Sequence, residues 1–110
     1  MTVDNTISKV RNDRAYPFEN GAYKGNPYIQ VTDLGVVFTG QTGPIKEVGL
    51  NGCQIDDLIS FSRDVIKVFN DRVSCTENTL VIQKLEEALL YLDARKKARE
   101  SRGVEGTSNA

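Results

Sequence analysis

The sequence contains no histidine among its 110 residues. Histidine is the commonest general base in enzymes and a frequent metal ligand, so its absence weighs against hydrolytic and metal-dependent catalysis. The chain also lacks the glycine-rich phosphate loops, metalloprotease helices and nucleophile elbows of common enzyme classes. The acid pairs Asp56-Asp57 and Glu86-Glu87 are adjacent in sequence and point in different directions on a helix. We therefore expect a binding protein without catalytic residues, metal site or cofactor.

Cysteine is scarce, and long apolar runs are missing. Cys53 and Cys75 form no CxxC pair, and the N-terminus has no apolar signal-peptide core, so reduced thiols in a cytosolic protein are expected. Cys53 has two interpretations, a reactive thiol or a small buried side chain, and the second is the simpler. No apolar run approaches the roughly 20 residues of a membrane-spanning helix, so we expect no membrane partner.

Neither sign of charge dominates, since 14 basic and 15 acidic residues leave a formal net charge of −1. A general nucleic-acid binder needs a large basic surplus to neutralise phosphates, so a nucleic-acid polymer is not an expected partner. The charge is nevertheless uneven, because residues 93–110 carry five basic and three acidic groups. A local positive patch of this size suits a small anionic ligand.

The length and the distribution of polar residues predict one small domain. Residues 1–26 are polar and predict a flexible N-terminal arm, which is either a free tail or a segment that packs on a neighbouring subunit. Residues 27–103 form the domain, and residues 104–110 a small polar tail. A domain of this size often gains stability from self-association, so we expect an oligomer.

Apolar periodicity predicts an α+β fold, with a small antiparallel N-terminal sheet followed by a two-helix antiparallel hairpin. Short β-branched runs separated by turn residues predict strands at 28–31, 36–39 and 45–48. Helical spacing then predicts helices over about 55–71 and 77–102. Thr76 is the expected N-cap of the second helix, and Gly103 is the residue expected to end it. The residues expected to face inward are Val81, Leu85, Ala88, Leu89 and Leu92.

A stripe of arginines continues the apolar face of the second helix. At 100° per residue, its members span about 60° on the side of the preceding apolar residues. They are Arg95, Arg99 and Arg102. Because the second helix is longer by roughly eight residues, it extends about 12 Å past the first at 1.5 Å per residue. The arginines thus face the turn at 51–54, the sheet edge or another subunit.

Two interpretations of the arginines stay open. Guanidinium groups two turns apart, beside the turn that contains Asn51, suit a pyrophosphate, because each can donate two hydrogen bonds to phosphate oxygens. Arginine near a helix C-terminus also complements the helix dipole. In that case the partners would be acidic side chains of the same chain. The candidates for such pairing are Glu47, Asp56 and Asp57.

Phe69 and Asn78 flank the loop between the two helices. Phe69 is either core or a ring that stacks on a base, and Asn78 is either a first-turn polar residue or a reader of a base edge. Asn78 lies about 25 Å along the helix from Arg95, at 1.5 Å for each of roughly 17 residues. One chain cannot bring both ends into one pocket, whereas two hairpins packed antiparallel could.

Two segments resemble the phage-encoded Thoeris anti-defence sponge family. They are GPIKEVGLNGCQIDDLI (43–59) and ENTLVIQKLEEALLYLDARKKARESRGVEGT (77–107). The resemblance covers about the last two-thirds of the chain, excluding the N-terminal arm. It implies a β-sheet and helical-hairpin protein in the cytoplasm of the infected bacterium. Such a protein holds the Thoeris signal glycocyclic ADP-ribose between subunits of a dimer without cleaving it. Some members form hexamers and also hold cyclic dinucleotides of CBASS signalling in a separate pocket.

The resemblance also assigns roles to residues. It places Arg95, Arg99 and Arg102 on the family's arginines, and Phe69 and Asn78 on its aromatic and amide near the hairpin loop. Arg95 and Arg99 would hold the pyrophosphate, Phe69 would stack on adenine and Asn78 would contact a polar edge. The family often has tryptophan where this chain has Tyr91, which leaves the role of Tyr91 open.

Two other classes of function compete with the sponge. One is a small oligomeric interaction module whose basic hairpin binds a protein partner, with the arginines as interface anchors. The other is a phosphodiesterase, which the missing histidine and missing metal cluster disfavour. Retention of intact ligand separates the three.

Overall fold

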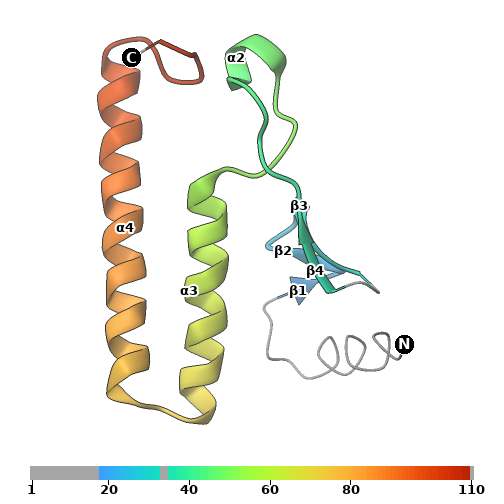
Figure 1. The fold of residues 1–110 in the computed structure, drawn as a ribbon, viewed down its shortest axis with the longest axis vertical. Helices are drawn as coiled ribbons and strands as arrows, with labels where there is room; N and C mark the ends of the chain where they lie inside the picture. Colours follow the sequence, from blue (N-terminus) through green and yellow to red (C-terminus); the bar gives the residue numbers. More distant parts are fainter. Residues whose placement is uncertain (1–17, 33–34, 110) are drawn as a thin grey trace.

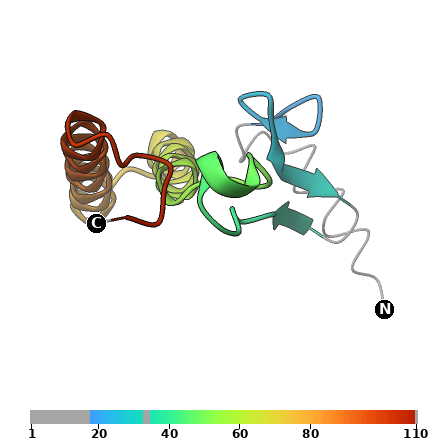
Figure 2. The same ribbon diagram turned by 90° about the horizontal axis from the view of Figure 1, so that it is seen from above.

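A small antiparallel sheet precedes a long helical hairpin, as the sequence predicted (Figure 1). The structure, a computed structural model, describes residues 18–32 and 35–109. The α+β class is therefore confirmed. The sheet and hairpin lie side by side, with α3 (Ile55–Arg72) between the sheet and α4 (Thr76–Ser101) in both views (Figures 1 and 2). In the described part of the chain, no helix has the length and apolarity needed to cross a bilayer.

Within the described residues, the sheet has four strands in sequential antiparallel order. They are β1 (Phe18–Glu19), β2 (Ala22–Tyr23), β3 (Asn26–Thr32) and β4 (Gly35–Phe38). The turns on either side of β2 place Asn20 and Lys24 at φ 53° and 50°, each followed by a glycine with positive φ. β3 and β4 match two predicted strands, but β1 and β2 lie within the predicted arm. The rest of that arm, residues 1–17, falls outside the described residues.

The third predicted strand is wrong, because Ile45–Val48 forms the single helical turn α2. Pro44 precedes it in an extended conformation, and its carbonyl accepts hydrogen bonds from the amides of Glu47 and Val48 at 3.0 and 2.9 Å. Gly49 at φ 83° then reverses the chain. Four residues are too few to display a helical period, so their β-branched composition was misleading.

The core lies between the sheet and the first turns of α3. Tyr23, Ile29 and Cys53 are its buried side chains, and Phe61 of α3 packs against them. The Phe61 ring meets that of Tyr23 edge-on, with centroids 5.3 Å apart. Burial raises the pKa of the Cys53 thiol, with the Asp57 carboxylate adding to the effect. Of the two interpretations of Cys53, the small buried side chain is the one the structure supports.

Asp64 of α3 ties the sheet to the hairpin. Its carboxylate accepts a hydrogen bond from the Tyr23 hydroxyl at 2.5 Å and pairs with Lys24 and Arg63, each at 3.1 Å. Burial alone would raise the pKa of Asp64, but hydrogen bonds from Tyr23, Lys24 and Arg63 outweigh it and hold the pKa below its ordinary value. Burial and the neighbouring carboxylate raise the pKa of Tyr23. The link is therefore strongest with Asp64 ionised.

This arrangement predicts an acid-sensitive contribution to stability. Because the pKa of Asp64 is lowered on folding, its contribution is complete above the unfolded value of about 4 and is lost as pH falls through the folded pKa. Asp64→Asn is expected to cost about 1–3 kcal/mol in the free energy of unfolding at pH 7, and progressively less as the pH falls from about 4 through the lowered pKa of Asp64. Urea denaturation at each pH measures this cost. The exposed Asp71→Asn is the control. A cost independent of pH would contradict the assignment.

The helical hairpin closely follows its predicted bounds. The N-cap of α4 is Cys75 rather than the predicted Thr76, because the Cys75 sulfur accepts the Asn78 amide at 3.4 Å. Four predicted inward residues are half-buried, but Val81 is 42% exposed. Within α3 and α4, both described in full, no side chain is completely buried. Large apolar side chains remain exposed on α4, including Leu80, Leu90 and Tyr91.

Candidate functional site

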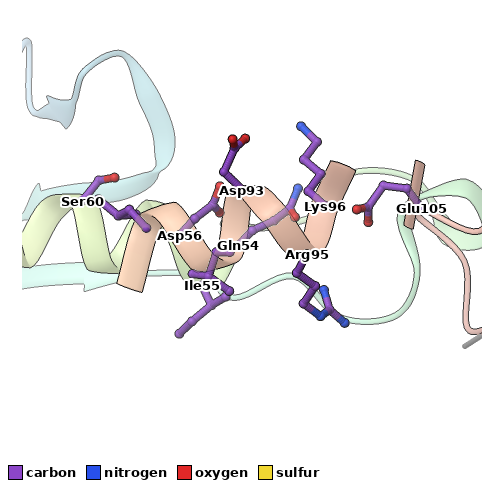
Figure 3. A pocket seen from close by; sticks show the side chains of 10 residues that line it. Gln54, Ile55, Asp56, Ser60, Asp93, Arg95, Lys96 and Glu105 are labelled. Atoms are coloured by element: carbon purple, nitrogen blue, oxygen red, sulfur yellow. The ribbon is translucent and has the colours of Figure 1, made fainter. Parts of the chain in front are cut away.

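The far end of α4 overhangs α3 and borders two adjoining cavities. As predicted, α4 is eight residues longer than α3. Each cavity has a volume of about 180 Å³, and Gln54, Arg95 and Glu105 line both. Asp56, Asp93 and Lys96 line the first (Figure 3). Arg99 joins Arg95 in the second. The predicted meeting of the arginines with the segment before α3 is thus present in one chain.

Arg99 is held in place by the chain that follows its own helix. Its Nη2 donates to the carbonyl oxygens of Val104 and Thr107 at 3.0 and 3.1 Å. Its Nε lies 3.8 Å from a Glu105 carboxylate oxygen, and its side chain is only 11% exposed. Arg99 therefore holds the end of the chain, through partners that are not the acids that the sequence suggested, and its role in ligand binding stays a prediction.

Residues 103–109, which we call the C-terminal hook, return toward α2. Gly103 adopts φ 72°, and the amides of Gly103 and Val104 bond back to Glu100 and Arg99, each at 3.0 Å. These two bonds close the helix as a Schellman motif, so the predicted glycine stop is confirmed. The Lys46 amide of α2 then donates to Gly106 at 2.7 Å. The segment predicted as a polar tail is thus docked on the domain as far as residue 109.

Arg95 differs from Arg99 because its guanidinium forms no hydrogen bond or ion pair with the described residues. It is exposed and lines both cavities. Among the described residues, no hydrogen-bond or ion-pair partner of its side chain is present. Figure 3 shows Arg95 and Lys96 pointing to different sides of α4, with Glu105 approaching from the hook. Arg95 is therefore the cation of the stripe best placed to meet an anion.

The opposite wall comes from residues 40–53, which we call the amide loop. The Gln41 side chain accepts from the amides of Asn51 and Gly52 at 2.9 and 3.2 Å and donates to the Gly43 and Gly49 carbonyls at 3.0 and 2.9 Å. The loop is thus closed across its own base. Gln41 lines the second cavity but was not predicted, because no local pattern reveals an amide that bonds across ten residues.

Asn51, a predicted ligand-binding residue, forms hydrogen bonds within the same loop. Its side-chain oxygen accepts the Thr42 amide at 2.8 Å, and its side-chain nitrogen donates to the Thr42 carbonyl at 2.9 Å. Both polar atoms are therefore engaged in holding the loop. Contact of Asn51 with a ligand stays a prediction, and such contact would require these bonds to break.

Two of the three predicted acidic partners of the arginines are engaged elsewhere, and the third forms no ion pair with an arginine among the described residues. Asp57 accepts the Gln54 amide at 2.9 Å and so caps α3. Glu47 accepts from the Ser108 hydroxyl of the hook at 3.2 Å. Asp56 lines the first cavity together with Arg95. The acid that approaches an arginine is instead Glu105, which the sequence did not single out.

The remaining predicted site residues do not reach the two cavities. Phe69 is 38% exposed near the end of α3, and the Asn78 side chain donates to the Val73 carbonyl at 3.3 Å in the hairpin loop. Both lie at the opposite end of the hairpin from Arg95. Arg102 is the exposed C-cap of α4. One chain thus gathers Arg95 and Arg99, and the roles predicted for the other three stay predictions.

A protein family and a known phage protein match much of the chain. Residues 33–96 match the family described as "Acb2/Tad1, hairpin domain". The protein named "Thoeris anti-defense 1" from Bacillus phage SBSphiJ7 is 47% identical over 68 residues, which is 61% of this chain and 48% of that protein. The chain therefore spans about half the length of the curated relative that it matches. The family match includes Arg95 and stops before Arg99 and the C-terminal hook.

Proposed function

Because this chain belongs to the Acb2/Tad1 hairpin-domain family, we propose that it is a bacteriophage protein that counters Thoeris defence. It acts by binding the defence signal, glycocyclic ADP-ribose, and withholding it from the bacterial effector. The place of action is the cytoplasm of the infected cell. The observation that carries the proposal is the uncommitted guanidinium of Arg95 beside a cavity walled by the amide loop and the C-terminal hook.

The chemistry of this end of α4 fits a pyrophosphate. Arg95 can offer both edges of its guanidinium, which matches two phosphate oxygens. Arg99 adds a second positive charge one helical turn away, with its position held by two carbonyls of the hook. Arg99 is thus held in place before a ligand arrives, and a fixed donor loses less entropy on binding than a mobile one.

Binding without turnover is part of the proposal. Cleavage of a pyrophosphate or glycosidic bond calls for a general acid or base or a metal-activated water. The sequence has no histidine, and within residues 18–32 and 35–109 no three metal-ligating side chains converge. Both observations favour retention over hydrolysis as the function to test first.

We further propose that the complete site is shared between two chains. Asn78 is about 25 Å from Arg95 along α4, at 1.5 Å per residue, and Phe69 lies at the same end of the hairpin as Asn78. Neither can share one nucleotide with Arg95 of the same chain. An antiparallel neighbour would bring its hairpin loop to the arginine end. The exposed Leu90 and Tyr91, 70% and 77% accessible, offer apolar area for such a contact. Assembly to hexamers and a separate cyclic-dinucleotide pocket complete the proposal that the family resemblance suggests.

Recovery of the ligand tests this function directly. The purified chain is incubated with glycocyclic ADP-ribose, freed of unbound nucleotide, heated and centrifuged, and the supernatant is analysed by chromatography and mass spectrometry. Most of the bound nucleotide should return intact, because a binding protein releases its ligand unchanged when it unfolds. A cleaved product would contradict the sponge function and indicate an enzyme. An empty supernatant would favour an interaction module that uses the exposed apolar residues of α4.

A further inference from the structure

A carboxylate stands among the cations of the candidate site. Glu105 lines both cavities together with Arg95, and its Oε1 lies 3.8 Å from the Arg99 Nε. Its side chain is 29% exposed, and Figure 3 shows it reaching toward α4 from the hook. A phosphate that enters the second cavity meets the negative charge of Glu105 as well as the two positive charges of Arg95 and Arg99. A site for a bare anion would gain nothing from that carboxylate.

The Glu105 carboxylate is not needed to hold the Arg99 side chain in place. The 3.8 Å separation exceeds hydrogen-bond distance. The guanidinium is already fixed by its bonds to the carbonyls of Val104 and Thr107 at 3.0 and 3.1 Å. The hook itself is held by the Lys46 amide and by the Schellman closure of α4. The carboxylate adds one bond to the hook, from the Gly106 amide to its Oε1, and that bond leaves its second oxygen unused.

Glu105 uses only one of its two carboxylate oxygens in contacts with the described residues. Its Oε1 accepts the Gly106 amide at 3.0 Å. Within the described ranges its Oε2 has no hydrogen-bond partner, which leaves a carboxylate acceptor at the wall of both cavities. The neighbouring hydroxyl of Thr107 is occupied, since it donates to the Val104 carbonyl at 2.5 Å. A ligand that suits this wall thus brings its own hydroxyl donor.

We propose that Glu105 is a specificity-determining residue that accepts a hydrogen bond from a sugar hydroxyl beside the pyrophosphate. This rests on the proposed function and names the chemistry that the site selects. A ribose pyrophosphate supplies oxygens for Arg95 and Arg99 and hydroxyls for Glu105. Inorganic pyrophosphate supplies only charge, which the carboxylate repels. Acidic side chains accept ribose hydroxyls in the same way in dinucleotide-binding folds.

Isothermal titration of the Glu105→Gln variant with two probes tests the proposal. Glycocyclic ADP-ribose should bind about tenfold more weakly than to the wild type, because a charge-assisted hydrogen bond becomes a neutral one. Inorganic pyrophosphate should bind several-fold more tightly, because a like charge is removed. The preference for the nucleotide therefore falls more than tenfold. Glu100→Gln, the same change at an exposed site on α4, should leave both affinities unchanged.

The outcomes separate the inference from the function on which it rests. If Glu105→Gln changes both affinities equally and in the same direction, Glu105 acts through general charge alone and the inference is overturned. A drop in the melting temperature of the free variant by more than a few degrees would make Glu105 structural and would equally overturn the inference. If the wild-type chain binds neither probe, the proposed function itself falls. Opposite shifts with an unchanged melting temperature support the inference.

Discussion

Replacement of Arg95 by alanine is expected to weaken binding of glycocyclic ADP-ribose by roughly 30- to 150-fold. This is the effect of losing about 2–3 kcal/mol of charge-assisted hydrogen bonding to a phosphate. The melting temperature of the free protein should hardly change, because in the described structure the Arg95 side chain is exposed and has no intramolecular partner. Titration calorimetry and thermal denaturation of the same preparation measure both quantities.

The matched control removes an equal charge from the same helix. Lys97 pairs with Asp93 at 2.9 Å, is 75% exposed and does not line either cavity. Lys97→Ala should therefore keep nearly full affinity. Arg99→Ala should lose affinity and stability together, since its bonds to the hook are lost with it. Equal losses of affinity in Arg95→Ala and Lys97→Ala would contradict direct contact of Arg95 with the ligand. They would show that the arginine stripe attracts the ligand only through its general positive charge.

The same variant also addresses the shared site. An equimolar mixture of Arg95→Ala and Phe69→Ala chains contains mixed dimers with one site composed entirely of unmutated groups. Ligand binding should return to about a quarter of the wild-type capacity if half of the dimers are mixed and each has one intact site of two. A mixture that binds no better than its components would show that Phe69 and Arg95 do not serve a common site.

The second large effect is expected at Gly52. A Cβ atom there would collide with the Gly40 carbonyl group and lie 2.6 Å from the Gln41 nitrogen, all of them backbone atoms. The two strands of the amide loop approach this closely because Gln41 donates its backbone amide to the Cys53 carbonyl at 2.8 Å, and Cys53 donates to Thr39 at 2.7 Å. Backbone atoms cannot rotate away as a side chain can.

Gly52→Ala should therefore cost about 3 kcal/mol or more in the free energy of unfolding, a fall in melting temperature of more than about 10 °C for a chain of this size. Gly40→Ala is the control, because a Cβ at Gly40 meets nothing within 4 Å. It faces the same loop from the other side and should be tolerated. Similar melting temperatures for the two variants would mean that the loop does not pack this closely.

Long-period features were predictable from the sequence. The two helices repeat their apolar spacing over several turns, so both their extents and the eight-residue overhang of α4 were found. Gly103 ends α4 as predicted, because a left-handed residue after a helix is a local requirement. The strands near 28–31 and 36–39 were predicted for a similar reason, since runs of β-branched and aromatic residues between turn residues indicate β-strands.

Very short elements, and segments held by backbone hydrogen bonds to distant residues, were not predictable. α2 and the strands β1 and β2 have two to four residues each, too few to establish a period. The C-terminal hook resembled a tail because its small polar residues carry no apolar pattern. Its order comes from backbone groups, namely the Gly106 carbonyl bonded to Lys46 and the Val104 and Thr107 carbonyls bonded to Arg99. Every residue has such groups, so composition cannot reveal them.

The sequence by itself determined that the arginines share the face of the apolar residues before them, because helical phase depends only on spacing. It could not distinguish one arginine from the next. The tertiary structure bonded Arg99 to the C-terminal hook and left Arg95 without an intramolecular partner among the described residues, since the returning hook reaches one guanidinium and not the other. It also brought Glu105 and Gln41 to the same cavity. Contacts between segments far apart in the chain depend on how the backbone returns, which no local pattern encodes.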